Sequence, residues 1–351
     1  FLWTVRFPVK PLLNFLICLW PFFVSCSQSS NTKYSGIQII SSQKINGLSY
    51  VASPRRISDT TISKIKSINA GWVTLMPFAF MKEINSPTLH YNSERQWWGE
   101  RIEGVRETVL ALKQKEIKVM LKPHIWIGHG SFTGQIRFTN EEHWKTLEQQ
   151  YELFILDFAR LAEETKCEMF CIGTELNSFA IERPIFWSSL INKVRACYNG
   201  GITYAENWDT YQSVPFWNQL DYIGVDAYFP ITNKQTFTLL DLDAGWSKYK
   251  NDLLIISQMH NKPILFTEYG YRSCDYAAQE PWSNNQHPVN LGNQKLALEA
   301  LFNKFWDEPW FAGGFLWKWY DTKEAGGDSN SDYTPQNKPA ENVIREVYRA
   351  R

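Results

Sequence analysis

Short apolar runs alternate with longer amphipathic segments along the chain after residue 40. The apolar runs are residues 47–52, 71–80, 118–126, 169–176, 201–208, 222–229, 263–270 and 313–320. The segments between them, 99–115, 146–166, 186–198, 245–260 and 295–306, and the closing segment 340–348, repeat apolar residues every three or four positions. This spacing predicts helices that pack on a sheet. Eight strands alternating with helices predict an α/β fold with a parallel sheet, and eight is the number that closes a (β/α)8 TIM barrel.

The predicted strand ends gather polar and aromatic side chains, whereas the strand bodies are apolar. These residues are His124, Trp126, Glu175, Asn177, Asn207, Trp208, Asp226, Tyr228, Glu268, Tyr269, Trp317 and Trp319. In residues 118–126 the alternation places Lys122, His124 and Trp126 on one face, which we expect to point into the barrel mouth. Active sites of such barrels lie at the C-terminal ends of the strands, so a site is predicted there.

Two glutamates, Glu175 and Glu268, end the fourth and seventh predicted strands. These strands face each other across a closed barrel, so the two side chains can converge on one substrate. Paired carboxylates suit glycosidic bond cleavage, in which one protonates the leaving oxygen and the other attacks the anomeric carbon. The alternative is that either glutamate forms a rim salt bridge, for example with Arg272. We expect Glu268, beside Tyr269 and Arg272 and with Tyr228 nearby, to be the anion and Glu175, which has no adjacent cation, to be the acid.

Composition narrows the class of ligand. Lys plus Arg equals Asp plus Glu at 36 each, without the basic excess of a nucleic-acid binder. The 16 Trp and 16 Tyr residues favour carbohydrate, because sugar rings pack on aromatic faces. Of the six His, only His124 lies on a predicted barrel-facing strand end, and the chain lacks HExxH or clustered ligands, so no metal or other cofactor is expected.

The N-terminal region predicts export. Arg6 and Lys10 precede an apolar run at 12–24, which is too short to span a bilayer and fits a signal-peptide core. The sequence "FVSC" resembles a bacterial lipobox with Cys26 as the lipidated residue, although Phe23 stands where Leu is usual. The alternative is ordinary cleavage with an incidental thiol. We expect a signal segment at 1–26, a polar tether at 27–42 and one catalytic domain at 43–351, anchored by lipid in the periplasm or at the cell surface.

Five stretches together resemble glycoside hydrolase family 113. They are "IGTELNS" (172–178), "GVDAYFP" (224–230), "ILFTEYGYRS" (264–273), "GGFLWKWY" (313–320) and "DYTPQNKPAENVI" (332–344). The resemblance covers nearly everything after the tether. It implies a retaining (β/α)8 hydrolase that cleaves β-1,4-mannan or glucomannan within the chain.

The resemblance also implies roles for individual residues. Glu175 matches the acid/base, Glu268 the nucleophile and Tyr228 the tyrosine that orients the nucleophile. Trp317 or Trp319 matches the tryptophan beneath the sugar at the cleavage point, and Trp317 is favoured. The wider clan usually has Asn directly before the acid/base, where this chain has Thr174. Asn177 or Asn207 is an alternative partner for the sugar 2-hydroxyl.

Other signals leave alternatives open. His124 binds sugar or satisfies a buried hydrogen bond, and "QWW" at 96–98 is a distal sugar platform or a packing cluster. "DSNSD" at 328–332 is read as a structural loop, because it lacks the glycine and glutamate of a calcium loop. The rivals for function are the same chemistry on a β-glucan or another hexosan, and a carbohydrate-binding surface lipoprotein without turnover.

Overall fold

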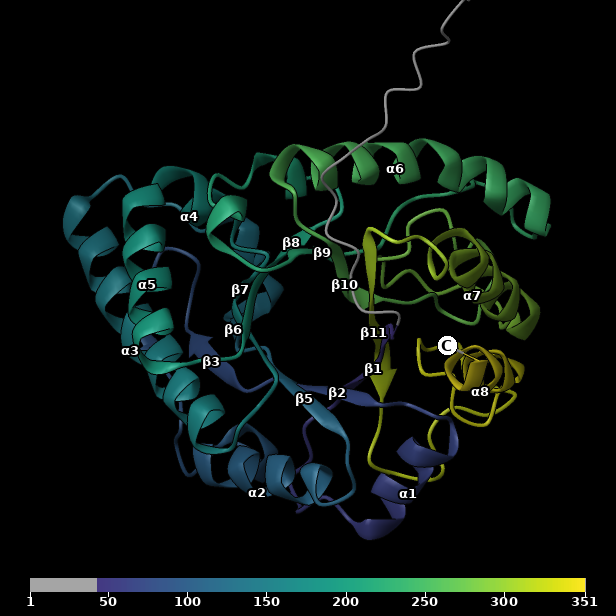
Figure 1. The fold of residues 1–351 in the computed structure, drawn as a ribbon, viewed down its shortest axis with the longest axis horizontal. Helices are drawn as coiled ribbons and strands as arrows, with labels where there is room; N and C mark the ends of the chain where they lie inside the picture. Colours follow the sequence, from purple (N-terminus) through teal and green to yellow (C-terminus); the bar gives the residue numbers. More distant parts are fainter. Residues whose placement is uncertain (1–42, 351) are drawn as a thin grey trace, which may run out of the picture. The chain divides into compact units, whose positions relative to one another are not determined.

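The computed structural model describes residues 43–350, so the predicted signal segment and Cys26 lie outside the described residues. Eight parallel strands close into a barrel in the order β1-β11-β10-β9-β8-β7-β5-β2, surrounded by helices (Figure 1). The barrel strands are β1 (Ile45–Tyr50), β2 (Trp72–Leu75), β5 (Lys118–Leu121), β7 (Met169–Thr174), β8 (Gly201–Asn207), β9 (Ile223–Asp226), β10 (Ile264–Tyr269) and β11 (Phe311–Trp319). The predicted (β/α)8 barrel is confirmed.

Residues 43–350 form eight α-helices. They are α1 (Asp59–Ser67), α2 (Ile102–Lys113), α3 (Glu141–Glu164), α4 (Asn177–Glu182), α5 (Pro184–Cys197), α6 (Leu239–His260), α7 (Leu291–Phe305) and α8 (Pro339–Ala350). Local chemistry sets their ends: α6 begins at a capping box made by Thr238 and Asp241 and stops at Asn261, which is left-handed at φ 51°. The short helices α1 and α4 were not predicted.

A second, smaller sheet divides two of the predicted strands. The runs 71–80 and 118–126 each supply a barrel strand and then a strand of this sheet, which has the order β4-β3-β6. Its strands are β3 (Phe78–Met81), β4 (Leu89–His90) and β6 (His124–Ile127). Pro77 and Pro123 cause the division, because a proline has no N–H to continue the hydrogen-bond ladder. His124 and Trp126 therefore belong to the small sheet and not to a barrel strand, which corrects the prediction.

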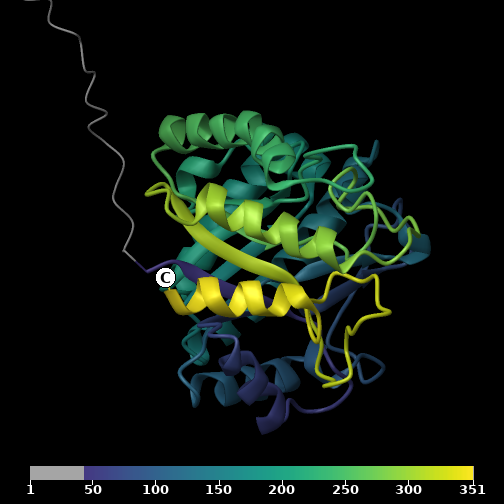
Figure 2. The same cartoon turned by 90° about the vertical axis from the view of Figure 1, so that its right-hand side faces the viewer.

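The barrel interior is packed with buried side chains. Side chains that include Met120, Met169, Leu265 and Phe315 fill it, and Cys171 packs among them as a free thiol. The site must therefore lie at a mouth of the barrel. Figure 2 shows the loops that follow the strands, among them the yellow segment after β11, on the side away from the C-terminus.

Within residues 43–350, no helix is long and apolar enough to cross a membrane.

Candidate functional site

Glu175 stands directly after β7 and Glu268 near the end of β10, three places apart in the ring of eight strands. The backbone at Glu175 has φ 51°, in the left-handed region that non-glycine residues rarely adopt. Two hydrogen bonds hold it there: its N–H donates to the Ala205 carbonyl (2.8 Å), and its carbonyl accepts from the Thr133 hydroxyl (3.0 Å). Strained backbone of this kind clusters at functional sites, so the observed conformation points to Glu175 as a working residue.

Glu268 lies deep in the mouth and is 6% exposed. The ammonium of Lys122 donates to its Oε1 at 2.5 Å, and the Tyr228 hydroxyl donates to its Oε2 at 2.8 Å. Both carboxylate oxygens therefore accept a hydrogen bond, and one of the donors is a cation. A buried carboxylate with these partners is compensated as an anion.

Lys122 is fully buried between two carboxylates. Its Nζ lies 3.0 and 3.2 Å from the two oxygens of Asp226 as well as 2.5 Å from Glu268. Burial alone would lower the pKa of Lys122, but the charges of Asp226 and Glu268 outweigh burial and raise it. Burial and the charge of Glu268 raise the pKa of Asp226 to about 7. Asp226 was expected among the substrate-binding side chains at the strand ends, but it has no exposed surface and contacts Lys122 instead.

The expected cation, Arg272, points elsewhere. It donates to Asn285 and Ser331, and Lys122 takes its place beside Glu268. The sequence carried a signal for Lys122, because a lysine at the mouth end of an apolar strand, on the face of His124, needs a buried partner.

Glu175 is partly exposed, and among the described residues no ion pair involves it. Burial raises its pKa well above the usual range, and the negative charges of Asp226 and Glu268 raise it further. Both effects favour the protonated form of Glu175, whereas the charge of Glu268 is compensated by Lys122. These are the opposite environments that separate an acid from a nucleophile.

The charge of Asp226 gives a pH prediction. Asp226→Asn removes a negative charge that raises the pKa of Glu175, so the acid form is lost at lower pH. We expect the alkaline limb of the kcat/KM profile to move to lower pH. The matched control is Asp243→Asn, which breaks the outer ion pair of Asp243 with Lys304 and should leave the limb in place. An unmoved limb in Asp226→Asn would contradict this assignment of the acid.

Sequence reasoning missed Glu206, a carboxylate on β8 with no exposed surface. It accepts hydrogen bonds from the Tyr204 hydroxyl (3.0 Å), the Asn207 N–H (2.9 Å) and the Thr210 hydroxyl (2.9 Å). The Tyr204 oxygen in turn accepts from the N–H of Leu176 at 2.8 Å. Burial raises the pKa of Glu206. This network supports the backbone next to Glu175, and the signal was the same as for Glu175: an acid in the apolar run "GITYAENW".

His124 and the two tryptophans of β11 have different exposures. Burial and the charge of Lys122 hold the pKa of His124 well below its ordinary value, so the ring is neutral. Its Nε2 lies 3.9 Å from Glu268 and has no hydrogen-bond partner among the described residues. Trp317 is partly exposed, but Trp319 is 2% exposed and packs in the core, which argues against a sugar contact for Trp319.

The remaining predicted residues lie at the barrel mouth or on its rim. Asn177 begins α4, is partly exposed and donates from its amide to the Ser213 hydroxyl at 2.9 Å. Asn207 ends β8 and is partly exposed. Trp126, in the small sheet, is 55% exposed. The structure thus brings Lys122, Asp226, Tyr228 and Glu268 into direct contact and leaves Trp126 further out.

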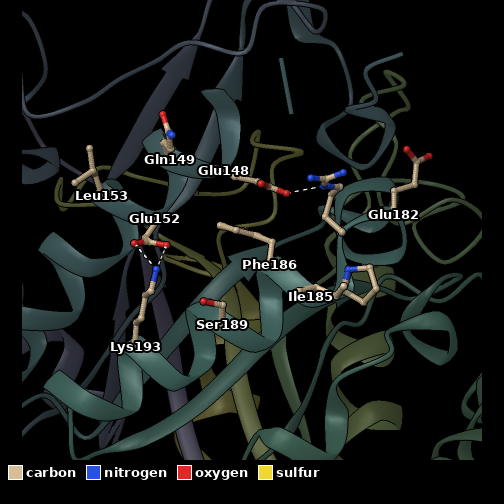
Figure 3. Close-up of a pocket in the computed structure, with 11 residues that line it drawn as sticks. Glu148, Gln149, Glu152, Leu153, Glu182, Ile185, Phe186, Ser189 and Lys193 are labelled. Carbon is tan, nitrogen blue, oxygen red and sulfur yellow. Dashed lines mark hydrogen bonds and ion pairs between the residues drawn. The ribbon is translucent and has the colours of Figure 1, made fainter. Parts of the chain in front are cut away.

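A separate hollow of about 780 Å³ lies on the outer surface beside α3 and α5 (Figure 3). Its walls carry ion pairs, Glu152 with Lys193 and Glu148 with Arg183. None of the predicted site residues lines it, so it is not the site described above. Among residues 43–350, no cluster of His, Cys, Asp and Glu has the arrangement of a metal site.

Comparisons with known proteins agree with this geometry. A structure of a GH113 β-mannanase from Alicyclobacillus acidocaldarius in complex with ManMIm is 27% identical, with a TM-score of 0.77 over 88% of this chain and 97% of that one. A GH113 β-1,4-mannanase solved as a complex is 23% identical, with a TM-score of 0.78 over 88% and 100%. A β-glucuronidase from Faecalibacterium prausnitzii shares only the fold, at 16% identity and a TM-score of 0.58 over 88% and 49%.

A search of curated proteins returned no match to the sequence. The family model described as Glycoside Hydrolase Family 113 matches residues 54–338, which is most of the chain and includes both glutamates. The chain therefore belongs to glycoside hydrolase family 113.

Proposed function

We propose that this glycoside hydrolase cleaves β-1,4-linked mannan or glucomannan with retention of anomeric configuration. The observation that carries the mechanism is the contrast between the two glutamates. Glu268 accepts hydrogen bonds from Lys122 and Tyr228, whereas burial and nearby negative charge raise the pKa of Glu175. The substrate is supported by the 27% identical structure, which is a β-mannanase.

In the first step a Glu268 oxygen attacks the anomeric carbon and forms an ester bond with the sugar. The bond from that carbon to the glycosidic oxygen breaks, and Glu175 gives its proton to the departing oxygen. In the second step Glu175, now a carboxylate, takes a proton from water as the water attacks the same carbon. Glu268 leaves as a carboxylate, Glu175 is again protonated, and two inversions give net retention.

Other residues of the mouth position the substrate and the nucleophile. The Tyr228 hydroxyl and the Lys122 ammonium hold the Glu268 carboxylate in place. The unpartnered Nε2 of neutral His124 is placed to bond a sugar hydroxyl beside Glu268. The partly exposed ring of Trp317 is suited to lie under the sugar at the cleavage point.

The test is hydrolysis of β-mannan, glucomannan and mixed-linkage β-glucan by the purified protein. We expect activity selective for the two mannose-containing polymers, lost in Glu175→Gln and Glu268→Ala but kept in Glu346→Gln, which changes an exposed glutamate on α8. NMR of the first product should show the β-anomer. Preference for the glucan would replace the proposed substrate, and an α-anomer as first product would contradict retention.

A further inference from the structure

The small sheet beside the barrel mouth has two unlike faces. On one face the side chains of Ala79, Met81, Leu89, Ile125 and Ile127 are at most 7% exposed and belong to the core. The side chains of Phe78, Phe80, His90, His124 and Trp126 alternate with them and form the other face. All five residues of this second face, which we name the aromatic face, carry rings and retain exposed surface.

Strand register makes the aromatic face a continuous row. Phe78 pairs with His124 and Phe80 with Trp126 between β3 and β6, and Phe80 pairs with His90 between β3 and β4. Paired residues of neighbouring strands share a face. The ring of Phe78 lies 5.3 Å from that of His124 and 6.4 Å from that of Trp126. The rings of Phe78, His124 and Trp126 therefore lie beside one another across β3 and β6.

The row begins at the catalytic centre and leads away from it. His124 lies 3.9 Å from Glu268. Trp126 is two residues further along β6, which moves it roughly 6.6 Å along the strand on the same face. A ligand bound at Glu268 that extends past His124 would therefore meet the ring of Trp126 next.

A hollow of about 990 Å³ adjoins this face. It is lined by Phe80, His90, the segment 93–97 and Glu100. The amide of Gln96 donates to the Phe78 carbonyl at 2.9 Å, which holds the segment 93–97 against β3. The walls of the hollow combine aromatic rings with hydroxyl, amide and charged groups of both signs, which are supplied by residues between Ser93 and Glu100. This combination suits a neutral polyhydroxylated ligand and not a highly charged one.

Core packing does not account for the exposed rings. The opposite face of the sheet already supplies the core contact, whereas Trp126 is 55% and Trp97 is 51% exposed. Large apolar side chains that remain in water beside a catalytic centre are typical of a binding surface. The interpretation of "QWW" as a packing cluster holds for Gln96, which is 8% exposed, but not for Trp97.

We propose that the aromatic face and its adjoining hollow bind sugar units of the polysaccharide beyond the cleavage point, so that catalysis depends on chain length. The inference rests on the proposed function, because it concerns the same neutral glycan. It adds an extended binding surface, in which Trp126 selects long substrates over short ones.

The kinetic test compares β-1,4-manno-oligosaccharides of increasing length. For the wild-type protein we expect kcat/KM to rise from the shortest cleaved oligosaccharide to the hexasaccharide. Trp126→Ala should lose about tenfold in kcat/KM on the hexasaccharide, mainly through KM, and several-fold less on the shortest substrate. Tenfold corresponds to about 1.4 kcal/mol, in the range of an aromatic contact.

Two further variants separate binding from folding. Trp126→Phe keeps a ring and should recover most of the length dependence. Ile185→Ala removes an apolar side chain on α5 that is 86% exposed and lies outside the site. It should leave the ratio of kcat/KM on long to kcat/KM on short substrates unchanged. An equal loss at all lengths in Trp126→Ala, or no loss on the hexasaccharide, would overturn the inference.

A binding test distinguishes failure of this inference from failure of the proposed function. Glu175→Gln, with and without Trp126→Ala, is run in native gels that contain β-mannan or mixed-linkage β-glucan. If a gel polysaccharide retards Glu175→Gln and the added Trp126→Ala change relieves this retardation, the inference is supported, whichever polysaccharide is used. If this happens only in the gel with mixed-linkage β-glucan, the inference is supported but the assignment of mannan as substrate fails. Retardation that is absent, or equal with and without Trp126, overturns the inference.

Discussion

Glu268→Ala is expected to lower kcat on a mannan substrate by roughly 10⁴- to 10⁶-fold, the scale seen when a nucleophile is removed from a catalytic set. The reason is that no other described carboxylate can take its place. Asp226 is fully buried and bound to Lys122, and Glu175 is required in its protonated form. Substrate binding should persist, because the aromatic walls are unchanged.

Rescue by azide tests the role of Glu268 directly. With an aryl glycoside that has a good leaving group, azide in the space left by Glu268→Ala should attack the anomeric carbon once and release an α-glycosyl azide. The matched variant is Glu175→Gln, which should remain slow on mannan but cleave a dinitrophenyl glycoside rapidly in the first step, because that leaving group needs no proton. Rescue of Glu175→Gln with an α-azide product would reverse the two assignments.

Lys122→Met is expected to lower the free energy of unfolding by about 3–5 kcal/mol at pH 7, because it leaves buried carboxylates without their cation. Lys122 is fully buried, and it contacts both Asp226 and Glu268. Urea unfolding of the variant and the wild-type protein measures the difference. Lys193→Met is the control: Lys193 is 47% exposed and pairs with Glu152, so its loss should cost less than about 1 kcal/mol.

The deficit of Lys122→Met should also depend on pH. Burial and the charge of Glu268 raise the folded-state pKa of Asp226 above its unfolded value of about 4, and loss of the Lys122 cation removes an interaction that opposes this shift. A carboxyl group shifted in this direction does not destabilise the protein below its unfolded pKa, and its destabilising effect grows as the pH rises from the unfolded to the folded pKa. The deficit should therefore be smaller at pH 5 than at pH 7, and Lys122→Met/Asp226→Asn should recover part of it. A deficit independent of pH, with no recovery in the double variant, would contradict the buried charge cluster.

The barrel could be predicted because the signals for it are local. Each of the eight barrel strands overlaps one predicted apolar run, since a strand buried on both faces needs a continuous apolar stretch. The division of the runs 71–80 and 118–126 was missed, although Pro77 and Pro123 marked it. An apolar run indicates that a segment is buried. Strands of the barrel and of the small sheet are both buried on at least one face, so hydrophobicity alone did not distinguish the strands of one sheet from those of the other.

The positions of the two glutamates at strand ends could be predicted, but most of their partners could not. Tyr228 was expected beside Glu268 and lies there. Arg272 was expected because it is close in sequence, whereas Lys122, 146 residues away, provides the cation. Neighbours in sequence on a strand point to opposite faces, and side chains meet across a barrel only through strand order and register.

The sequence by itself determined the number of barrel strands and the place of the two glutamates at strand ends, because burial periodicity and strand ends are properties of short segments. Only the tertiary structure decided the environment of each glutamate. Lys122 and Asp226 come from different strands, Glu206 supports Glu175 through Tyr204, and exposure distinguishes Trp317 from Trp319. Charge compensation and burial depend on groups brought together from distant parts of the chain, so no short segment could carry that information.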